Sequence, residues 1–177
     1  CRFLESFLLG AGVRSVVDVG CGHWPTGYQR FLDWGGVAYL GVDVVPRMVE
    51  DSRQYLARMP RWAAHGLRSV DFEVADACAQ LPTADLLLAK DVLMHLPNEA
   101  VFRFLKSHVC PEVPRYRFVM LVQNESPMPH IRSFIDIEPA QLLPFSVSDE
   151  PFKAAFEDVF CWESDQSKSV QLWEAPV

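Results

Sequence analysis

The residues best suited to chemistry in this chain form a short turn between residues 16 and 25, which reads V-V-D-V-G-C-G-H-W-P. Asp18 and two closely spaced glycines, Gly20 and Gly22, end an apolar run whose β-branched residues favour a buried strand. Glycine permits backbone angles and close approaches that a Cβ would forbid. A helix-like spacing of apolar residues follows between residues 28 and 35. A strand, a glycine turn and a helix N-terminus would together present backbone N–H groups to a nucleotide-type ligand.

A second group of polar residues follows the fourth predicted strand. Lys90 and Asp91 end that strand, and His95 lies just beyond it in the segment D-V-L-M-H-L-P. An oxygen nucleophile needs a proton acceptor, and the ordinary pKa of histidine, about 6.5, makes His95 the best candidate. A structural histidine that caps the next helix is an equally open alternative. Asp91 is the second candidate base, and its alternative role is a turn residue bonded to the backbone.

The elements that must position these residues alternate along the chain. Runs of β-branched and apolar residues predict strands, and apolar residues spaced by three or four predict helices. The predicted helices are Phe3–Leu8, a helix that begins at Pro46 with Met48, Tyr55, Leu56 and Met59 on one face, and Glu99–Val109; the predicted strands are Val16–Val19, Ala38–Val45, Val70–Val74, Leu86–Ala89, Phe118–Val122, Phe156–Trp162 and Val170–Trp173.

This alternation predicts the fold class. Strands alternating with helices favour an α/β protein that has a mostly parallel sheet with helices on both faces. The last two predicted strands are joined by the polar stretch 163–169. Because that stretch is too short for a helical crossover, the two strands should pair antiparallel. We therefore expect one domain over residues 1–177, with a seven-stranded, mostly parallel sheet that ends in an antiparallel C-terminal hairpin.

The glycine turn alone is a weak signal, because dinucleotide dehydrogenases also use one. Their fingerprint G-x-G-x-x-G would place glycines at positions 20, 22 and 25, but position 25 is Pro25. The third glycine of that fingerprint permits close packing of strand and helix beneath a pyrophosphate. The proline therefore disfavours a dinucleotide, whereas a ligand without a pyrophosphate would not need the third glycine.

The chain resembles the class I S-adenosylmethionine-dependent methyltransferases through D-V-G-C-G at residues 18–22 and through the acidic Asp43 at the end of the second predicted strand. The resemblance covers nearly the whole chain. It implies a Rossmann-like methyltransferase fold, with S-adenosylmethionine as the cofactor. One residue departs from the family pattern, since Trp24 stands where a third glycine is usual. Trp24 either lines the cofactor or packs in the core.

The resemblance also implies which residues bind the cofactor. The turn would lie against the methionine part and the ribose, and Asp43 would accept hydrogen bonds from both ribose hydroxyls, which suits the two oxygens of a carboxylate. The positions after the third strand would bind the adenine, and the backbone of residues 91–97 would touch the methionine moiety or the methyl group. The cofactor-binding residues implied in this way are Asp18, Gly20, Cys21, Gly22, Asp43, Val44, Asp76, Ala77 and Lys90.

The composition limits the partners and the setting of the protein. A formal charge of −7 and a pI near 5.2 oppose a nucleic-acid partner, since such binding draws its strength from clustered Lys and Arg. The five cysteines include no C-x-x-C pair and the five histidines no H-x-x-x-H pair, so we expect no disulfide framework and no metal site. No apolar stretch approaches the roughly 20 residues that cross a bilayer. We expect a cytoplasmic protein without a membrane partner.

Two regions bear on the methyl acceptor. Amino-directed nucleic-acid methyltransferases carry Asn or Asp, two prolines and an aromatic residue at the end of the fourth strand, whereas residues 90–93 read K-D-V-L. The Pro-rich insertion at about 125–152 is the candidate acceptor lid. Its apolar and polar side chains could line a pocket or as easily seal an edge of the core; they are Met128, His130, Phe134 and Phe145. The expected reaction is methyl transfer to a small molecule or a glycan. A protein acceptor, and a non-catalytic binding or scaffold module, are the alternatives.

Overall fold

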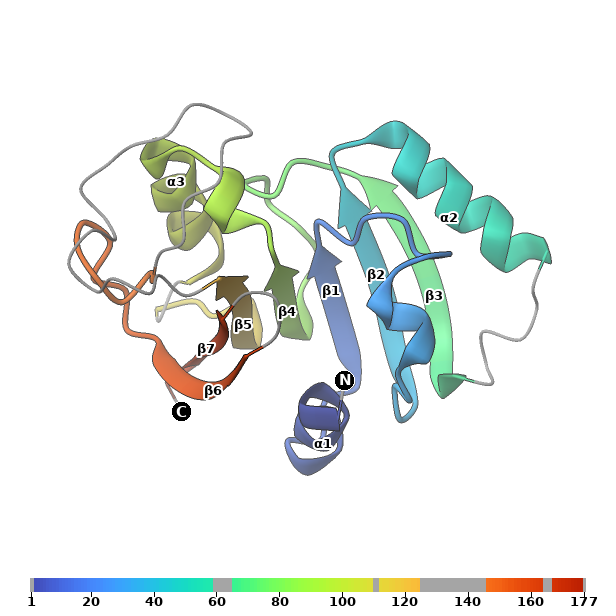
Figure 1. Ribbon diagram of the computed structural model, residues 1–177, viewed down its shortest axis with the longest axis horizontal. Helices are drawn as coiled ribbons and strands as arrows, with labels where there is room; N and C mark the ends of the chain where they lie inside the picture. The colour runs from blue at the N-terminus through green and yellow to red at the C-terminus, as the bar shows by residue number, and fades with distance from the viewer. Residues whose placement is uncertain (1, 59–64, 110–111, 125–145, 164–166, 177) are drawn as a thin grey trace. The chain divides into compact units, whose positions relative to one another are not determined.

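A computed structural model describes residues 2–58, 65–109, 112–124, 146–163 and 167–176. Its strands form one seven-stranded mixed sheet in the order β3-β2-β1-β4-β5-β7-β6 (Figure 1). The helices are α1 (Arg2–Gly10), α2 (Pro46–Arg58), α3 (Asn98–His108) and the 3₁₀ helices η1 (Tyr28–Phe31) and η3 (Leu93–His95); the strands are β1 (Ser15–Val19), β2 (Val37–Asp43), β3 (Leu67–Val74), β4 (Ala84–Lys90), β5 (Tyr116–Asn124), β6 (Glu157–Glu163) and β7 (Ser167–Glu174). The predicted α/β sheet and its antiparallel ending are confirmed.

The contacts between residues divide the chain into two compact units, which are described one at a time. Unit 1 comprises Cys1–Ala77 and Leu81–Leu87, and unit 2 comprises Cys78–Gln80 and Leu88–Val177. Strand β4 contributes residues to both units. The expectation of a single domain concerns how the two units fit together, and it stays a prediction.

In unit 1, strands β1, β2 and β3 run parallel, with Gly41 of β2 opposite Phe72 of β3. Helix α2 packs against β2 and β3 (Figure 1). It can do so because Val49, Ser52 and Leu56, spaced by three and four residues, form one buried face. The helix begins with a proline, whose missing N–H is not needed at the first helical position. This packing fixes the carboxyl ends of β1 to β3, where the candidate residues of unit 1 lie.

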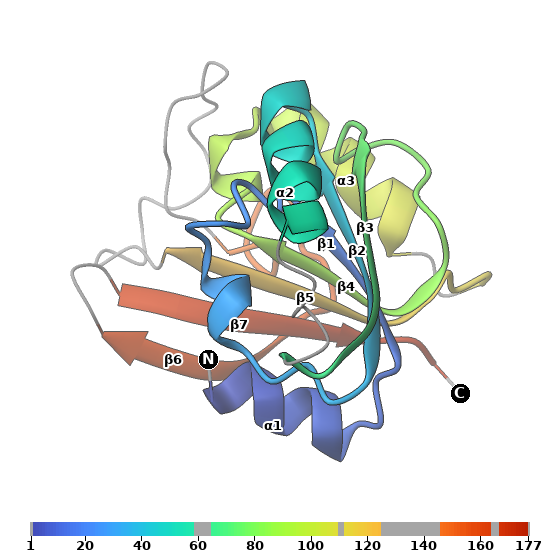
Figure 2. The ribbon, with the colours of Figure 1, turned by 90° about the vertical axis from the view of Figure 1, so that its right-hand side faces the viewer.

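In unit 2, β7 lies between β5 and β6 and is antiparallel to both (Figure 2). Asn124, the last residue of β5, is opposite Lys168 near the start of β7. Helix α3 buries Val101, Phe104 and His108 along one side. The end of β5 and the start of β7 are therefore neighbours, although the two residues are far apart in the sequence.

The prediction of a helix after the glycine turn is wrong. Between β1 and β2 the structure has only η1, a 3₁₀ helix of 4 residues. Helical geometry does not continue beyond η1, because Leu32 is extended (φ −91°, ψ 144°) and Gly35 and Gly36 have left-handed φ values of +61° and +90°. Trp24, which precedes this segment, lies in the core: its side chain is 0 % exposed, its backbone N–H donates to Ser52 Oγ of α2 at 3.1 Å, and its ring packs edge-on against Phe72. Trp24 thus packs in the core, which is one of the two positions expected for it; the other was beside the cofactor.

The bounds of the other elements differ from the prediction by up to about three residues; β3, for example, begins at Leu67 rather than at Val70. Strand β2 ends at Asp43 rather than at Val45, and the two valines that follow Asp43 are exposed. The predicted apolar face of α2 is only partly buried, because Met48 and Tyr55 are half-exposed at its margins. Met59 lies outside the described residues. The seven strands and the helices α1, α2 and α3 are nevertheless those that the sequence predicts.

Only the end of the Pro-rich insertion is described. Residues 146–152 fold against β7, where Val147 is buried and its N–H donates to Gln171 Oε1 at 3.2 Å. The role of acceptor lid for residues 125–152 stays a prediction. The residues named as its pocket lining lie outside the described residues: Met128, His130, Phe134 and Phe145.

Candidate cofactor-binding site

The glycine turn after β1 runs along the carboxyl end of β2. The Cys21 N–H donates to the Val42 carbonyl at 3.1 Å, and the Gly22 N–H donates to Asp43 Oδ2 at 2.9 Å. Gly20 and Gly22 have φ angles of +65° and +62°, which are left-handed values that favour glycine. The structure thus brings the predicted glycines together with Asp43.

Asp43 has acceptor capacity left, and there is open space beside Gly22, to which it is bonded. Its side chain is largely buried, Oδ2 accepts from Gly22, and Oδ1 accepts from the Val45 N–H at 2.9 Å. Each carboxylate oxygen has two lone pairs, so one acceptor position remains on each. A Cβ built on Gly22 would meet no atom within 4 Å. A ligand beside the turn could therefore bond to both oxygens of Asp43.

Asp18 is buried inside unit 1 and supports the turn from within. Its Oδ2 accepts from the Tyr39 hydroxyl at 2.6 Å and from Gln29 Nε2 at 3.1 Å. The same Nε2 donates to the Cys21 carbonyl at 2.8 Å. Burial first, and then the charge of Asp18, raise the pKa of Tyr39 well above its ordinary value, so the hydroxyl stays protonated and donates. Asp18 thus acts on the turn through Gln29.

Gln29 and Tyr39 are not among the residues expected from the sequence. Tyr39 lies opposite Val16 in the parallel pairing of β1 with β2, two residues from the partner of Asp18. A tyrosine in an otherwise aliphatic strand could have signalled a buried hydrogen bond, since buried hydroxyls are usually paired. Nothing in the sequence marks Gln29, because its role depends on η1 folding back over the turn.

The Cys21 thiol is buried, and both backbone polar groups of Cys21 bond within unit 1. Burial first, and then the charges of Asp18 and Asp43, raise the pKa of the Cys21 thiol above its ordinary value. A Cβ on Gly41 would lie 2.9 Å from Cys21 Sγ, which shows how tightly the sulfur is packed. The thiol is therefore protonated at neutral pH and is not a nucleophile.

The other candidates of unit 1 lie around the end of β2. The Ala75 N–H donates to the Asp43 carbonyl at 3.1 Å and so links the residues after β3 to β2. Val44 is 67 % exposed, which is unusual for valine beside a buried strand end. Asp76 is exposed and Ala77 is half-buried. All the predicted cofactor residues except Lys90 thus belong to unit 1.

The candidate residues of unit 2 meet two lysines. Lys168 Nζ donates to Asp91 Oδ1 and to Asn124 Oδ1, at 2.6 Å in each case, and Lys90 pairs with Asp91 Oδ2. We call Lys90, Asp91, Asn124 and Lys168 the lysine cluster. The sequence analysis identifies the first two members only, because Lys168 and Asn124 join them through the pairing of β5 with β7.

Asp91 is held firmly and is a weak base. Burial alone would raise the pKa of its carboxyl, but the hydrogen bonds and charges of Lys168 and Lys90 lower it below its ordinary value. Its N–H donates to the Val122 carbonyl at 2.8 Å, and its φ is +57°, a left-handed value. The side chain therefore bonds to lysines and not, as the alternative role supposed, to the backbone.

His95 is the last residue of η3 and is half-buried. Its N–H donates to the Val92 carbonyl at 3.0 Å, and the two preceding residues, Leu93 and Met94, are buried and anchor the 3₁₀ turn. The N-cap residue of α3 is Pro97, two positions later. The structure thus places His95 on a fixed turn between β4 and α3, and its role as a base stays a prediction.

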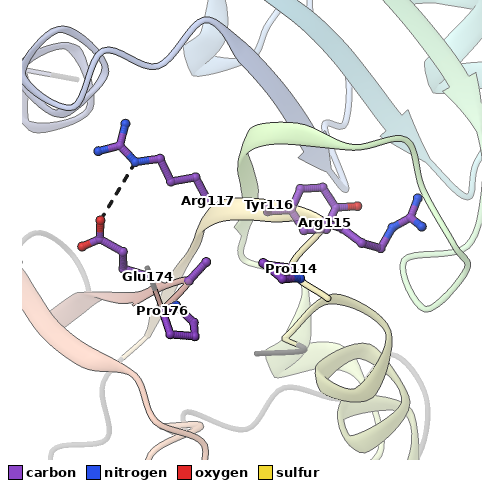
Figure 3. A pocket seen from close by; sticks show the side chains of 7 residues that line it. Pro114, Arg115, Tyr116, Arg117, Glu174 and Pro176 are labelled. Carbon is purple, nitrogen blue, oxygen red and sulfur yellow. Dashed lines mark ion pairs between the residues drawn. The ribbon is translucent and has the colours of Figure 1, made fainter. Parts of the chain in front are cut away.

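A hollow of about 390 Å³ lies at the other end of β5 in unit 2 (Figure 3). Its lining residues are Pro114, Arg115, Tyr116, Arg117, Glu174, Ala175 and Pro176. Figure 3 shows Arg117 and Glu174 directed toward each other; the ion pair spans 4.0 Å and both side chains are more than half exposed. Such a pair contributes little. The hollow contains none of the predicted site residues.

Two further findings concern only the described part of the chain. No group of three or more His, Cys, Asp or Glu residues there could hold a metal ion. None of the helices described is long and apolar enough to span a membrane.

Comparisons with known proteins identify the fold. No protein-family model matches the chain, and no curated protein matches its sequence. Among solved structures, it is similar to magnesium protoporphyrin IX methyltransferase from Synechocystis PCC 6803 with bound S-adenosylhomocysteine, at 14 % identity over 99 % of this chain and 81 % of that chain, with a TM-score of 0.68. It is also similar to the methyltransferase domain of bacterial CtHen1, at 13 % identity over 99 % of this chain and 96 % of that chain, with a TM-score of 0.67. For TehB from Haemophilus influenzae the identity is 12 % over 99 % of this chain and 62 % of that chain, with a TM-score of 0.65. This chain therefore has the Rossmann-like fold of the class I S-adenosylmethionine-dependent methyltransferases.

Proposed function

We propose that this protein binds S-adenosylmethionine at the glycine turn and Asp43 and transfers its methyl group to an acceptor. The observation that carries the proposal is Asp43, a largely buried carboxylate at the end of β2 that bonds to the Gly22 N–H and keeps an acceptor position on each oxygen. Two adjacent ribose hydroxyls would occupy these positions. The S-adenosylhomocysteine bound to a protein of the same fold supports this choice of ligand.

The residues beside Asp43 fit an adenosyl group. Val74 is paired with Asp43 in the sheet and is 50 % exposed, and Val44 follows Asp43 and is also exposed. Apolar side chains exposed beside a polar anchor are suited to cover the faces of a purine. Asp76, with Ala77 after it, would accept a hydrogen bond from the adenine amino group. The space beside Gly22 would hold the ligand, and a side chain at that position would occupy it.

Methyl transfer asks the protein mainly for positioning. Bound S-adenosylmethionine supplies an electrophilic methyl group, and holding an acceptor atom in line with it removes much of the barrier. For an oxygen acceptor we assign His95 as the proton acceptor. The two lysines beside Asp91 lower the pKa of its carboxyl and so weaken it as a base, which favours His95 over Asp91.

We assign a small molecule or a glycan as the acceptor. The charge of −7 disfavours nucleic acid, and residues 90–93 lack the two prolines and aromatic residue of amino-directed nucleic-acid enzymes. A protein acceptor and a non-catalytic binding role are the competing assignments. The contact between Asp43 and Gly22 favours cofactor use over a scaffold role, since a scaffold has no need for a carboxylate at this turn.

Titration calorimetry with S-adenosylmethionine and S-adenosylhomocysteine tests the cofactor, and we expect one binding site for each. Thermal melting gives an independent reading, since about 1 mM of a ligand with a Kd of about 10 μM stabilises the folded state by about 2.7 kcal/mol. The absence of both heat and stabilisation would refute cofactor binding. A screen of small molecules, glycans and peptides for S-adenosylhomocysteine formation then tests the acceptor. Turnover with peptides alone would replace our assignment by the protein acceptor.

A further inference from the structure

The lysine cluster of unit 2 gathers charge that the proposed cofactor contacts do not use. Lys168 Nζ lies 2.6 Å from Asp91 Oδ1 and 2.6 Å from Asn124 Oδ1, and Lys90 pairs with the second oxygen of Asp91. The members come from the ends of β4 and β5 and from the start of β7. These strand ends thus bring two ammonium groups to one carboxylate.

The ammonium of Lys168 keeps one N–H donor for a ligand, and its charge is only partly balanced by Asp91. Its side chain is only 15 % exposed, so water solvates the ammonium poorly. An ammonium has three N–H donors, and two of those of Lys168 meet acceptors within the described residues. Removing an ammonium from water is costly unless hydrogen bonds and opposite charge replace the water. Because Lys90 shares the charge of Asp91, a further anionic partner would complete the environment of Lys168.

The backbone of Asp91 is held in an uncommon conformation within the cluster. Its φ of +57° costs an ordinary L-residue roughly 1–2 kcal/mol, although aspartate tolerates it better than most. The N–H bond to the Val122 carbonyl and the two lysines hold this conformation in place. Strained residues that are held by their surroundings occur preferentially at active sites and ligand clamps.

We propose that the lysine cluster binds an anionic group of the methyl acceptor, a carboxylate or a phosphate, through Lys168. The proposal rests on the proposed function. An anionic oxygen would accept the third N–H of Lys168 in a charge-assisted hydrogen bond, which is about twice as strong as a neutral one. A neutral hydroxyl or amide would gain less, because it does not offset the ammonium charge. The acceptor is therefore an acidic small molecule or an acidic glycan, although the protein as a whole carries a charge of −7.

Matched probes test the proposal by NMR titration of the full chain, with and without S-adenosylhomocysteine. The probes are benzoate and phenyl phosphate, with benzamide and benzyl alcohol as neutral counterparts. We expect at least one anionic probe to bind at least 10-fold more tightly than its neutral counterpart, and the two anionic probes distinguish a carboxylate site from a phosphate site. Lys168→Met should remove this preference and Lys168→Arg should keep most of it. Lys153→Met, which removes a lysine paired with Glu150 on the surface of the same unit, should change nothing.

Equal affinity for anionic and neutral probes would overturn the proposal, and so would an undiminished preference in Lys168→Met. In either case the cluster would be only a brace between the ends of β4, β5 and β7. A fall in S-adenosylmethionine affinity in Lys168→Met would assign the cluster to the cofactor and would also overturn it. If Lys168→Met does not fold, the wild-type probe comparison still decides. If the protein prefers anionic probes but does not bind S-adenosylmethionine, the anion site stands and the proposed function fails.

Discussion

Replacing Asp43 by asparagine should weaken S-adenosylmethionine binding by about 100-fold. Each carboxylate oxygen already holds one backbone N–H at 2.9 Å and keeps one acceptor position for the ligand. Asparagine retains a single neutral oxygen, and its NH₂ group would face either the Gly22 or the Val45 N–H, so one ligand bond is lost and the other is weakened. Hydrogen bonds to charged groups contribute about 1.5–3 kcal/mol each. A total loss near 3 kcal/mol corresponds to about two orders of magnitude in Kd.

Asp85→Asn is the matched control in the same unit. Asp85 Oδ2 also accepts two backbone N–H groups, from Arg14 at 2.7 Å and from Ser15 at 3.0 Å, but it does so at the amino end of β1. Without ligand, Asp85→Asn should lose less folding stability than Asp43→Asn, because one amide oxygen can still accept both of its N–H groups, whereas Asp43 uses a different oxygen for each N–H. Only Asp43→Asn should lose affinity for the cofactor, because Asp85 lies at the other end of the strand from the glycine turn.

Calorimetry measures the two Kd values, and thermal melting checks them. At about 1 mM ligand, a protein with a Kd of about 10 μM gains about 2.7 kcal/mol, whereas one with a Kd of about 1 mM gains only about 0.4 kcal/mol. The ligand-induced stabilisation of Asp43→Asn should thus almost vanish while that of Asp85→Asn stays intact. An affinity of Asp43→Asn within about 3-fold of wild type, or an equal loss in both variants, would show that Asp43 does not bind the ribose.

Three further predictions concern single residues. Gly22→Ala should cost about 1–2 kcal/mol of stability, because its φ is +62°, and should abolish cofactor binding in calorimetry, because the methyl group fills the open space. Gly41→Ala should destabilise the fold by overpacking, since its Cβ would lie 2.5 Å from a ring carbon of Phe72. A larger loss of cofactor affinity in Gly41→Ala than in Gly22→Ala would contradict the position of the ligand beside Gly22. In alkylation with iodoacetamide at pH 8, read by mass spectrometry, the exposed Cys161 should react quickly and the buried Cys21, whose thiol pKa is raised, only on unfolding; early labelling of Cys21 would show that its thiol is accessible. Because the pKa of Asp91 is lowered in the folded state, its ion pairs stabilise the protein above the unfolded pKa, near 4, and this contribution is lost as the pH falls through the folded pKa. In urea unfolding, Asp91→Asn should therefore be less stable than the wild type at pH 7 and should lose less stability than the wild type below about pH 4. Parallel profiles of stability against pH for the two proteins would refute the pairing.

The strands could be predicted from the sequence because some, such as β4, are compact apolar runs and others, such as β3, alternate polar and apolar residues. The antiparallel end of the sheet followed from a connection too short to cross over, and the structure has the hairpin β6–β7. Asp43 and the glycines could be singled out because of their residue types and their positions at strand ends, and the structure brings Gly22 and Asp43 together; their role in binding the cofactor stays a proposal. These are local properties, which a single sequence displays directly.

Contacts that depend on tertiary pairing could not be predicted. Lys168 reaches Asp91 across 77 positions in the sequence, and it does so only because β7 lies antiparallel beside β5. Gln29 bonds to Asp18 and to the Cys21 carbonyl only because the segment after the turn folds back in a 3₁₀ helix. The apolar spacing after the turn resembles that of a helix, but Leu32 and Trp34 are buried without one and Phe31 is 66 % exposed.

The missing helix after the glycine turn also bears on the chemistry of the site. A helix N-terminus that faces a ligand favours anions such as a pyrophosphate, through its N–H groups and its dipole. Here the turn is held instead by Trp24 in the core, by Gln29 and by the carboxylate of Asp43, and Asp76 lies exposed after the next strand. An electrostatic environment built from carboxylates and without a helix dipole disfavours phosphate and suits a cationic ligand. S-adenosylmethionine carries a sulfonium, so the feature that departs most from the expected pattern is also one that favours the proposed cofactor over a nucleotide.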